Sequence, residues 1–178
     1  AGNLLGSKQH GFLEAVGFDY FMDLLDQTIK ELQGEKIEEA KSEINLRVDI
    51  RIPESYLPQI NLRLNLYKRV SSIESLDEVG RIKEEVKDRF GPLPRSVENL
   101  LQYGAVKHLA QEIRMRAIDR IGNRLVLKFS PAGLADLDRF TRFLETCAAE
   151  LTPQGVLTVP RSSNADTVVM DETLSVLK

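Results

Sequence analysis

Apolar and polar residues alternate most regularly between residues 44 and 52. The apolar positions are Ile44, Leu46, Val48, Ile50 and Ile52, and polar residues fill the places between them. A period of two puts every apolar side chain on one face, as in a strand buried on one side. Pro53 follows, and proline cannot donate to a sheet ladder, so the strand is predicted to end at residue 52.

Residues 59–70 carry a pattern that fits two structures. Ile60, Leu62, Leu64 and Leu66 alternate as in a strand, while Ile60, Leu64 and Tyr67 also lie at helical spacing. We favour a helix, because one apolar stripe then runs along the segment and the basic residues near its end suit a helix.

Residues 75–90 predict a helix with a defined start and end. Ser75 and Glu78 have the spacing of a capping box, in which each side chain accepts a hydrogen bond from a free amide of the first turn. Gly91 and Pro92 are typical of the end of a helix. A second helix is predicted to begin at Pro94 and to end near residue 115.

The rest of the chain predicts short strands and further helices. Gly122 and Asn123 separate two apolar runs, which favours a tight hairpin. The predicted elements are strands 117–121, 124–130, 156–159 and 167–170, a helix over 134–151, and a final helix from Asp171 to Leu177. Because helices and strands do not alternate strictly, we expect an α+β fold with a small mixed or antiparallel sheet packed with several helices.

The first 43 residues differ from the rest. Glycines are dense in residues 1–17, which predicts a shaped loop, and residues 18–32 have the apolar stripe of a helix. Residues 35–43 are nearly all charged, as in a solvated linker. We therefore divide the chain into 1–34, 35–43 and a folded domain over 44–178. The chain opens on Ala1 without an initiator Met, as expected for part of a longer protein.

The composition excludes some classes of protein. Lys and Arg total 24 and Asp and Glu total 27, which gives a net charge of −3 and argues against a dedicated nucleic-acid binder. A local basic patch remains open, and its candidates are Arg114, Arg116, Arg120 and Arg124; a solvated face is the simpler interpretation. No basic leader or long apolar run predicts membrane insertion, and the single Cys147 suits a reducing compartment, so we expect a cytoplasmic protein.

The sequence contains no motif for catalysis or metal binding. The glycine-rich phosphate loop is absent, and one Cys with two His is too few ligands for a structural zinc site. Asp136, Asp138 and Glu145 could suggest a carboxylate cluster, but Asp136 and Asp138 are two residues apart and point to different sides of a predicted helix, which argues against a metal site. Cys147 is interpreted as a core residue, and His108, in the middle of a predicted helix, as a residue of the helix surface or of the boundary between surface and core. We predict no catalytic residue and no cofactor for this chain.

Several motifs nevertheless resemble one protein family. Residues 1–33, with Gly6-Ser7-Lys8-Gln9-His10-Gly11, resemble the translocation motif shared by RecG helicase and the transcription-repair coupling factors (the Mfd family). Residues 52–58, 63–69 and 88–94 resemble the C-terminal domain of the coupling factors alone. The ordered series is specific, although each motif by itself is not.

This resemblance implies a function for a longer parent protein. The parent would be a bacterial translocase, driven by ATP and Mg, that moves on double-stranded DNA, displaces stalled RNA polymerase and recruits nucleotide excision repair. Gly6, Gln9 and Gly11 would belong to the motif that couples ATP hydrolysis to movement. Residues 1–34 would be the end of this motif, and we expect residues 1–43 to be poorly anchored without the motor.

The resemblance also implies that residues 44–178 are a non-catalytic regulatory domain. In the family this domain packs on an N-terminal module that resembles UvrB and masks the surface that binds UvrA. Two alternatives stay open: a nucleic-acid contact module of a RecG-like helicase that uses the four arginines, and a small enzyme with an unrecognised site.

Overall fold

The computed structural model describes residues 42–130, 143–144, 149–151, 156–163, 165 and 168–178. Within these residues the chain forms a mixed five-stranded sheet and four helices, which confirms the predicted α+β fold with a mixed sheet. The strands are β1 (Glu43–Asn45), β2 (Met115–Ile121), β3 (Arg124–Phe129), β4 (Glu150–Leu151) and β5 (Leu157–Pro160). The helices are α3 (Ile60–Ser71), α4 (Leu76–Phe90), α5 (Arg95–Glu112) and α8 (Val169–Leu177).

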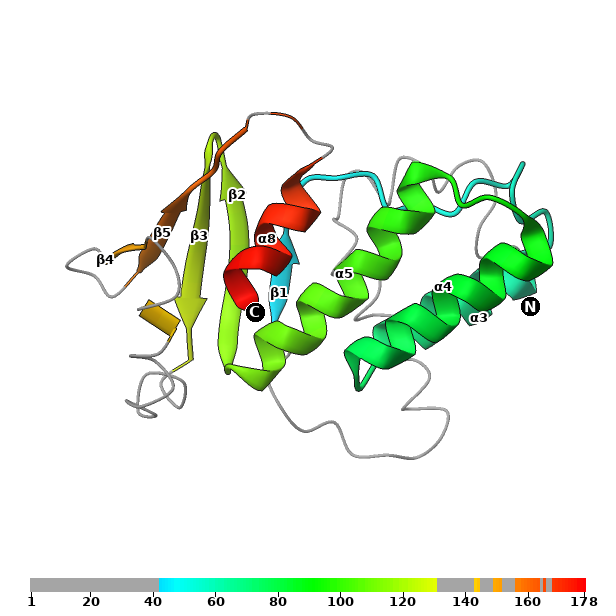
Figure 1. Cartoon of the computed structure of the whole chain (residues 1–178), viewed down its shortest axis with the longest axis horizontal. Helices are drawn as coiled ribbons and strands as arrows, with labels where there is room; N and C mark the ends of the chain where they lie inside the picture. Colours follow the sequence, from blue (N-terminus) through cyan, green and yellow to red (C-terminus); the bar gives the residue numbers. More distant parts are fainter. Residues whose placement is uncertain (1–41, 131–142, 145–148, 152–155, 164, 166–167) are drawn as a thin grey trace, which may run out of the picture.

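Helix α5 connects the two parts of the molecule. The sheet lies at one end and the pair α3 and α4 at the other, with α5 running between them and α8 packed against α5 (Figure 1). Helix α5 packs against α3, α4, α8 and β2, and ten of its 18 residues are buried. Burial of this extent is expected of a helix at such a central place.

The sheet has one apolar face. Its order is β1-β2-β3-β5-β4, in which β1 runs parallel to β2 and the other neighbours are antiparallel. The register aligns Ile44, Ile118, Leu127 and Leu157 across four strands, and all four are buried. Paired residues share a face, so this row forms the part of the core under the sheet. The predicted hairpin is confirmed, with Gly122 at φ 57° in its turn.

Helices α3 and α4 begin and end close to where the sequence predicts. The helical interpretation of residues 59–70 is confirmed by α3. The Ser75 hydroxyl accepts a hydrogen bond from the Glu78 amide at 3.3 Å, and Gly91 ends α4 at φ 87°. The capping box is only half correct, since the Glu78 carboxylate accepts from the Glu74 amide at 3.1 Å and not from that of Ser75.

The strand predicted over residues 44–52 is only partly correct. Ile44, Leu46, Ile50 and Ile52 are buried as the alternation requires, but only residues 43–45 join the ladder. Arg47 has a φ of 54°, in the left-handed region, which bends the chain away from β2. The side chains of Asn99 and Tyr67 then bond backbone groups of the extended stretch that follows.

Two predictions near the C-terminus are corrected. Residues 167–170 were expected to form a strand, yet α8 begins at Val169, because Val169 and Met170 are buried where α8 packs against α5. Asp171 therefore lies in the first turn of α8 and not at its cap. The helix predicted over residues 134–151 lies mostly outside the described residues; Phe143 and Leu144 are helical, but Glu150 and Leu151 already form β4.

In the part of the chain that the structure describes, no helix has the length and apolar character needed to cross a membrane.

Candidate functional site

The structure places the predicted site residues in different regions. Gly6, Gln9 and Gly11 lie outside the described residues, as do the predicted helix 18–32 and most of the charged segment 35–43. Strand β1 begins at Glu43, and the buried Ser42 hydroxyl donates to the Met115 carbonyl at 2.6 Å. The division of the chain into three units stays a prediction.

The four candidate arginines lie at two ends of β2. Arg114 and Arg116 are exposed beside the turn from α5, with Arg114 at φ 55°. Arg120 and Arg124 lie near the hairpin, about 20 Å away at about 3.3 Å per residue of strand. Arg120 pairs with Leu125 in the register and so points to the apolar face, while Arg124 bonds Glu150 at 2.9 Å. The arginines therefore form two separate pairs.

Metal chemistry finds no support in the described part of the chain. No group of three His, Cys, Asp or Glu side chains there could hold a metal ion. His108 lies half-buried on α5, which confirms its interpretation as a boundary residue. Cys147 and the carboxylates at 136, 138 and 145 lie outside the described residues.

The three motifs near the middle of the chain come together in space. The Tyr67 hydroxyl on α3 accepts a hydrogen bond from the Ile52 amide at 2.7 Å, and Arg63 donates to the carbonyls of Leu57 at 2.6 Å and Pro58 at 2.9 Å. These bonds attach residues 52–58 to α3. Burial raises the pKa of Tyr67, which keeps the phenol in its neutral form.

A second set of contacts attaches residues 52–58 to the end of α4. The Tyr56 hydroxyl donates to the Gly91 carbonyl at 2.9 Å, and the rings of Tyr56 and Phe90 meet edge to face with centroids 6.5 Å apart. Arg89 lies over the Phe90 ring, 5.1 Å from its centroid. Residues 52–58, 63–69 and 88–94 therefore form one junction, although 29 residues separate its first motif from its last.

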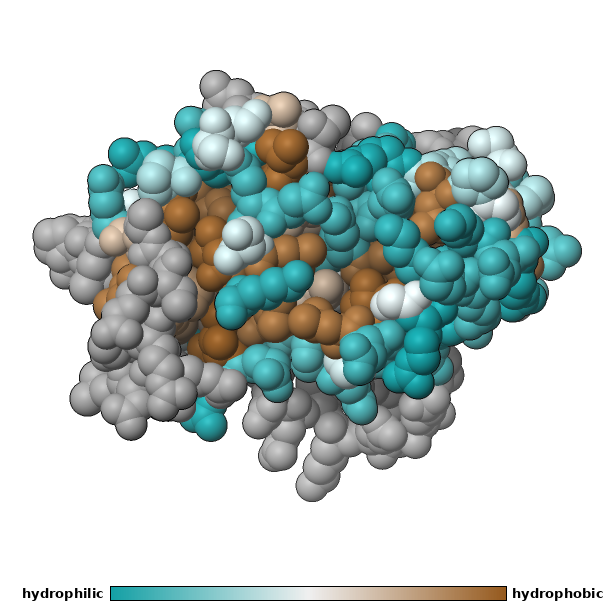
Figure 2. Space-filling view, in the orientation of Figure 1, coloured by the Kyte–Doolittle hydropathy of each residue, from teal (hydrophilic) through white to brown (hydrophobic). Residues whose placement is uncertain are grey.

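Next to this junction lies a cluster of three charges, which we call the α4 cluster: Arg69, Glu85 and Arg89. Arg69 forms a two-pronged ion pair with Glu85, with distances of 3.0 and 2.7 Å, and Arg89 reaches the same carboxylate at 3.3 Å. The bond from Arg69 is the main reason why the pKa of Glu85 lies below its ordinary value. Figure 2 shows that the surface over α4, at the right of the view, is largely hydrophilic. The α4 cluster is a surface site suited to a polar partner.

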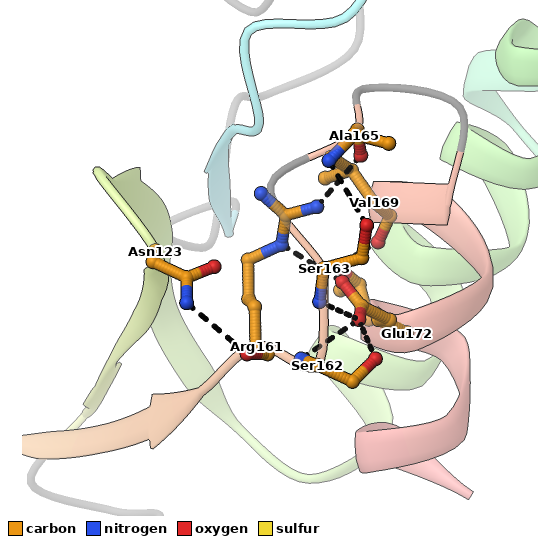
Figure 3. A network of polar contacts seen from close by, with 8 residues as sticks. Asn123, Arg161, Ser162, Ser163, Ala165, Val169 and Glu172 are labelled. Carbon is orange, nitrogen blue, oxygen red and sulfur yellow. Dashed lines mark hydrogen bonds and ion pairs between the residues drawn. The ribbon is translucent and has the colours of Figure 1, made fainter.

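A different network fixes α8, and we call it the α8 anchor (Figure 3). Arg161, whose side chain is fully buried, bonds Glu172 at 2.8 Å and donates to the Ala165 carbonyl at 2.9 Å. The other Glu172 oxygen accepts from the amides of Ser162 and Ser163 and from the Ser162 hydroxyl. In the hairpin turn, the Asn123 carbonyl accepts a hydrogen bond from the Arg161 amide at 2.9 Å, and the Asn123 side-chain amide donates to the Arg161 carbonyl at 3.3 Å. This network joins three elements and is structural.

The sequence could not have revealed the α4 cluster directly. Arg69 and Glu85 are 16 residues apart on different helices, so no helical spacing connects them. Only the pair of Glu85 and Arg89, four residues apart on α4, follows from sequence spacing.

Comparison with known proteins shows similarity to the transcription-repair-coupling factors. Residues 46–140 match the model of the TRCF domain. The transcription-repair-coupling factor of Haemophilus influenzae is 34% identical over 151 residues, which cover 82% of this chain and 13% of that protein. That of Bacillus subtilis is 35% identical over 140 residues, covering 78% of this chain and 12% of that protein. That of Escherichia coli is 32% identical over 136 residues, which cover 73% of this chain and 12% of that protein.

A solved structure has the same fold. The chain superposes on the crystal structure of a C-terminal domain of transcription-repair coupling factor with a TM-score of 0.63 and 20% identity. The match covers 78% of this chain and 94% of that domain. The chain thus spans nearly all of the solved domain, but only 12–13% of the length of these curated relatives.

Proposed function

The chain belongs to the TRCF domain family, and from that membership we propose that it is the non-catalytic regulatory domain of a bacterial transcription-repair coupling factor. The parent is then an ATP-dependent translocase on double-stranded DNA that displaces stalled RNA polymerase and recruits nucleotide excision repair. The match of residues 46–140 to the family model carries this proposal.

We further propose that the domain docks on the UvrB-like N-terminal module of its parent and thereby masks the surface that binds UvrA. The α4 cluster supports a docking role, because its side chains already have partners that fix their positions. Side chains that are ordered before binding lose less entropy on docking, and arginines are enriched at protein interfaces. The surface proposed for the contact therefore includes the exposed end of α4 with Arg89.

Tethering makes a weak contact sufficient. A module linked in the same chain acts at an effective concentration of about 1 mM, so a contact with a Kd of about 0.1 mM keeps the domain docked roughly nine-tenths of the time. Such a contact also opens readily, which a reversible mask requires.

The test compares UvrA binding by the full-length parent and by a parent from which residues 44–178 are deleted. Deletion is expected to tighten UvrA binding by about tenfold, because docking at that effective concentration leaves the UvrA-binding surface open only about one-tenth of the time. The translocation motif with Gln9 is kept, so ATPase activity serves as the control and is expected to persist. Equal UvrA affinities of the two proteins would contradict the masking role.

A nucleic-acid contact is the second candidate, and the exposure of Arg114 and Arg116 at one end of β2 favours it. This alternative predicts an affinity for double-stranded DNA that falls steeply as the salt concentration rises. The affinity is also expected to be lower in the double variant Arg114→Ala and Arg116→Ala than in the unaltered chain. DNA binding that is absent at low salt would exclude this alternative.

A further inference from the structure

We draw no further inference here: the strongest candidate, the buried Nη1 atom of Arg161 in the α8 anchor, has no hydrogen-bond partner among the described residues, but it belongs to the structural network already described and nothing in the structure shows which ligand would face it.

Discussion

The phenolic oxygen of Tyr67 lies 2.7 Å from the backbone nitrogen of Ile52 and accepts its hydrogen bond in a buried setting. Both residues are nearly inaccessible to solvent. The helix α3 thereby supplies the acceptor that a neighbouring strand supplies in a sheet. The segment after β1 can in this way leave the ladder without a buried amide lacking a partner.

Tyr67→Phe is expected to destabilise the domain by about 1–3 kcal/mol, because the ring is kept while the buried Ile52 amide loses its acceptor. Urea unfolding measures the change as a shift of the midpoint at constant slope. Tyr56→Phe is the control, since its hydroxyl bonds the Gly91 carbonyl in a partly exposed place, and its effect is expected to be smaller. Equal effects of the two variants would contradict the role given to Tyr67.

Gly104→Ala and Gly80→Ala are expected to act in opposite directions. A Cβ at Gly104 would lie 2.6 Å from Cδ1 of Ile73 and 3.0 Å from the Val70 carbonyl oxygen, so overpacking is expected to cost about 1–3 kcal/mol. A Cβ at Gly80 meets nothing within 4 Å, and alanine in the middle of α4 is expected to add about 0.5–1 kcal/mol of stability. Thermal denaturation of both variants checks the sign of each change.

The α8 anchor predicts a dependence of stability on pH. Burial alone would raise the pKa of Glu172, but hydrogen bonds from Ser162 and Arg161 outweigh it and hold the pKa below its ordinary value. A carboxyl whose pKa is lower in the folded state contributes stability above its unfolded pKa of about 4.5 and loses it as the pH falls through the folded pKa.

Glu172→Gln is therefore expected to destabilise the domain by about 3–5 kcal/mol near pH 7, since the buried Arg161 loses the carboxylate with which it pairs. The difference from the unaltered chain is expected to narrow as the pH falls below about 4.5. Chemical denaturation between pH 7 and pH 3 measures both. A difference that is constant over this range would show that the charge of Glu172 is not what stabilises α8.

The isolated chain is expected neither to bind nor to hydrolyse ATP, because its sequence has no phosphate-binding loop. Titration calorimetry with ATP and Mg is expected to give no binding tighter than about 1 mM. Binding that is tighter, and that is lost when a residue of this chain is substituted, would refute this prediction.

The periodicity of the sequence predicted which side chains are buried better than it predicted which partners the backbone bonds. The alternation over residues 44–52 identified the buried side chains, yet the pattern cannot tell a strand from an extended segment whose backbone bonds to side chains such as Asn99. The β-branched residues near 168 favoured a strand, but packing against α5 imposes a helix there. The intrinsic strand propensity of these residues is therefore overridden by the apolar packing of α8 against α5.

The chemistry of the surface was harder to foresee than the fold. The motif at residues 88–94 pointed to the end of α4, but the pairing of Arg69 with Glu85 depends on how α3 and α4 lie side by side. The four arginines near β2 are close in sequence, yet a strand extends about 3.3 Å per residue and carries them apart. Proximity along a strand is therefore poor evidence for a common patch.

The parallel pairing of β1 with β2 has a consequence for the order of folding. Glu43 pairs with Ala117 in the register, and the Ser42 and Met115 that bond each other lie 73 residues apart in the sequence. The β2–β3 hairpin, in contrast, needs a turn of only two residues. Loop-closure entropy and contact order make such distant pairing slow. We therefore expect the helices and the hairpin to form first and β1 to dock last.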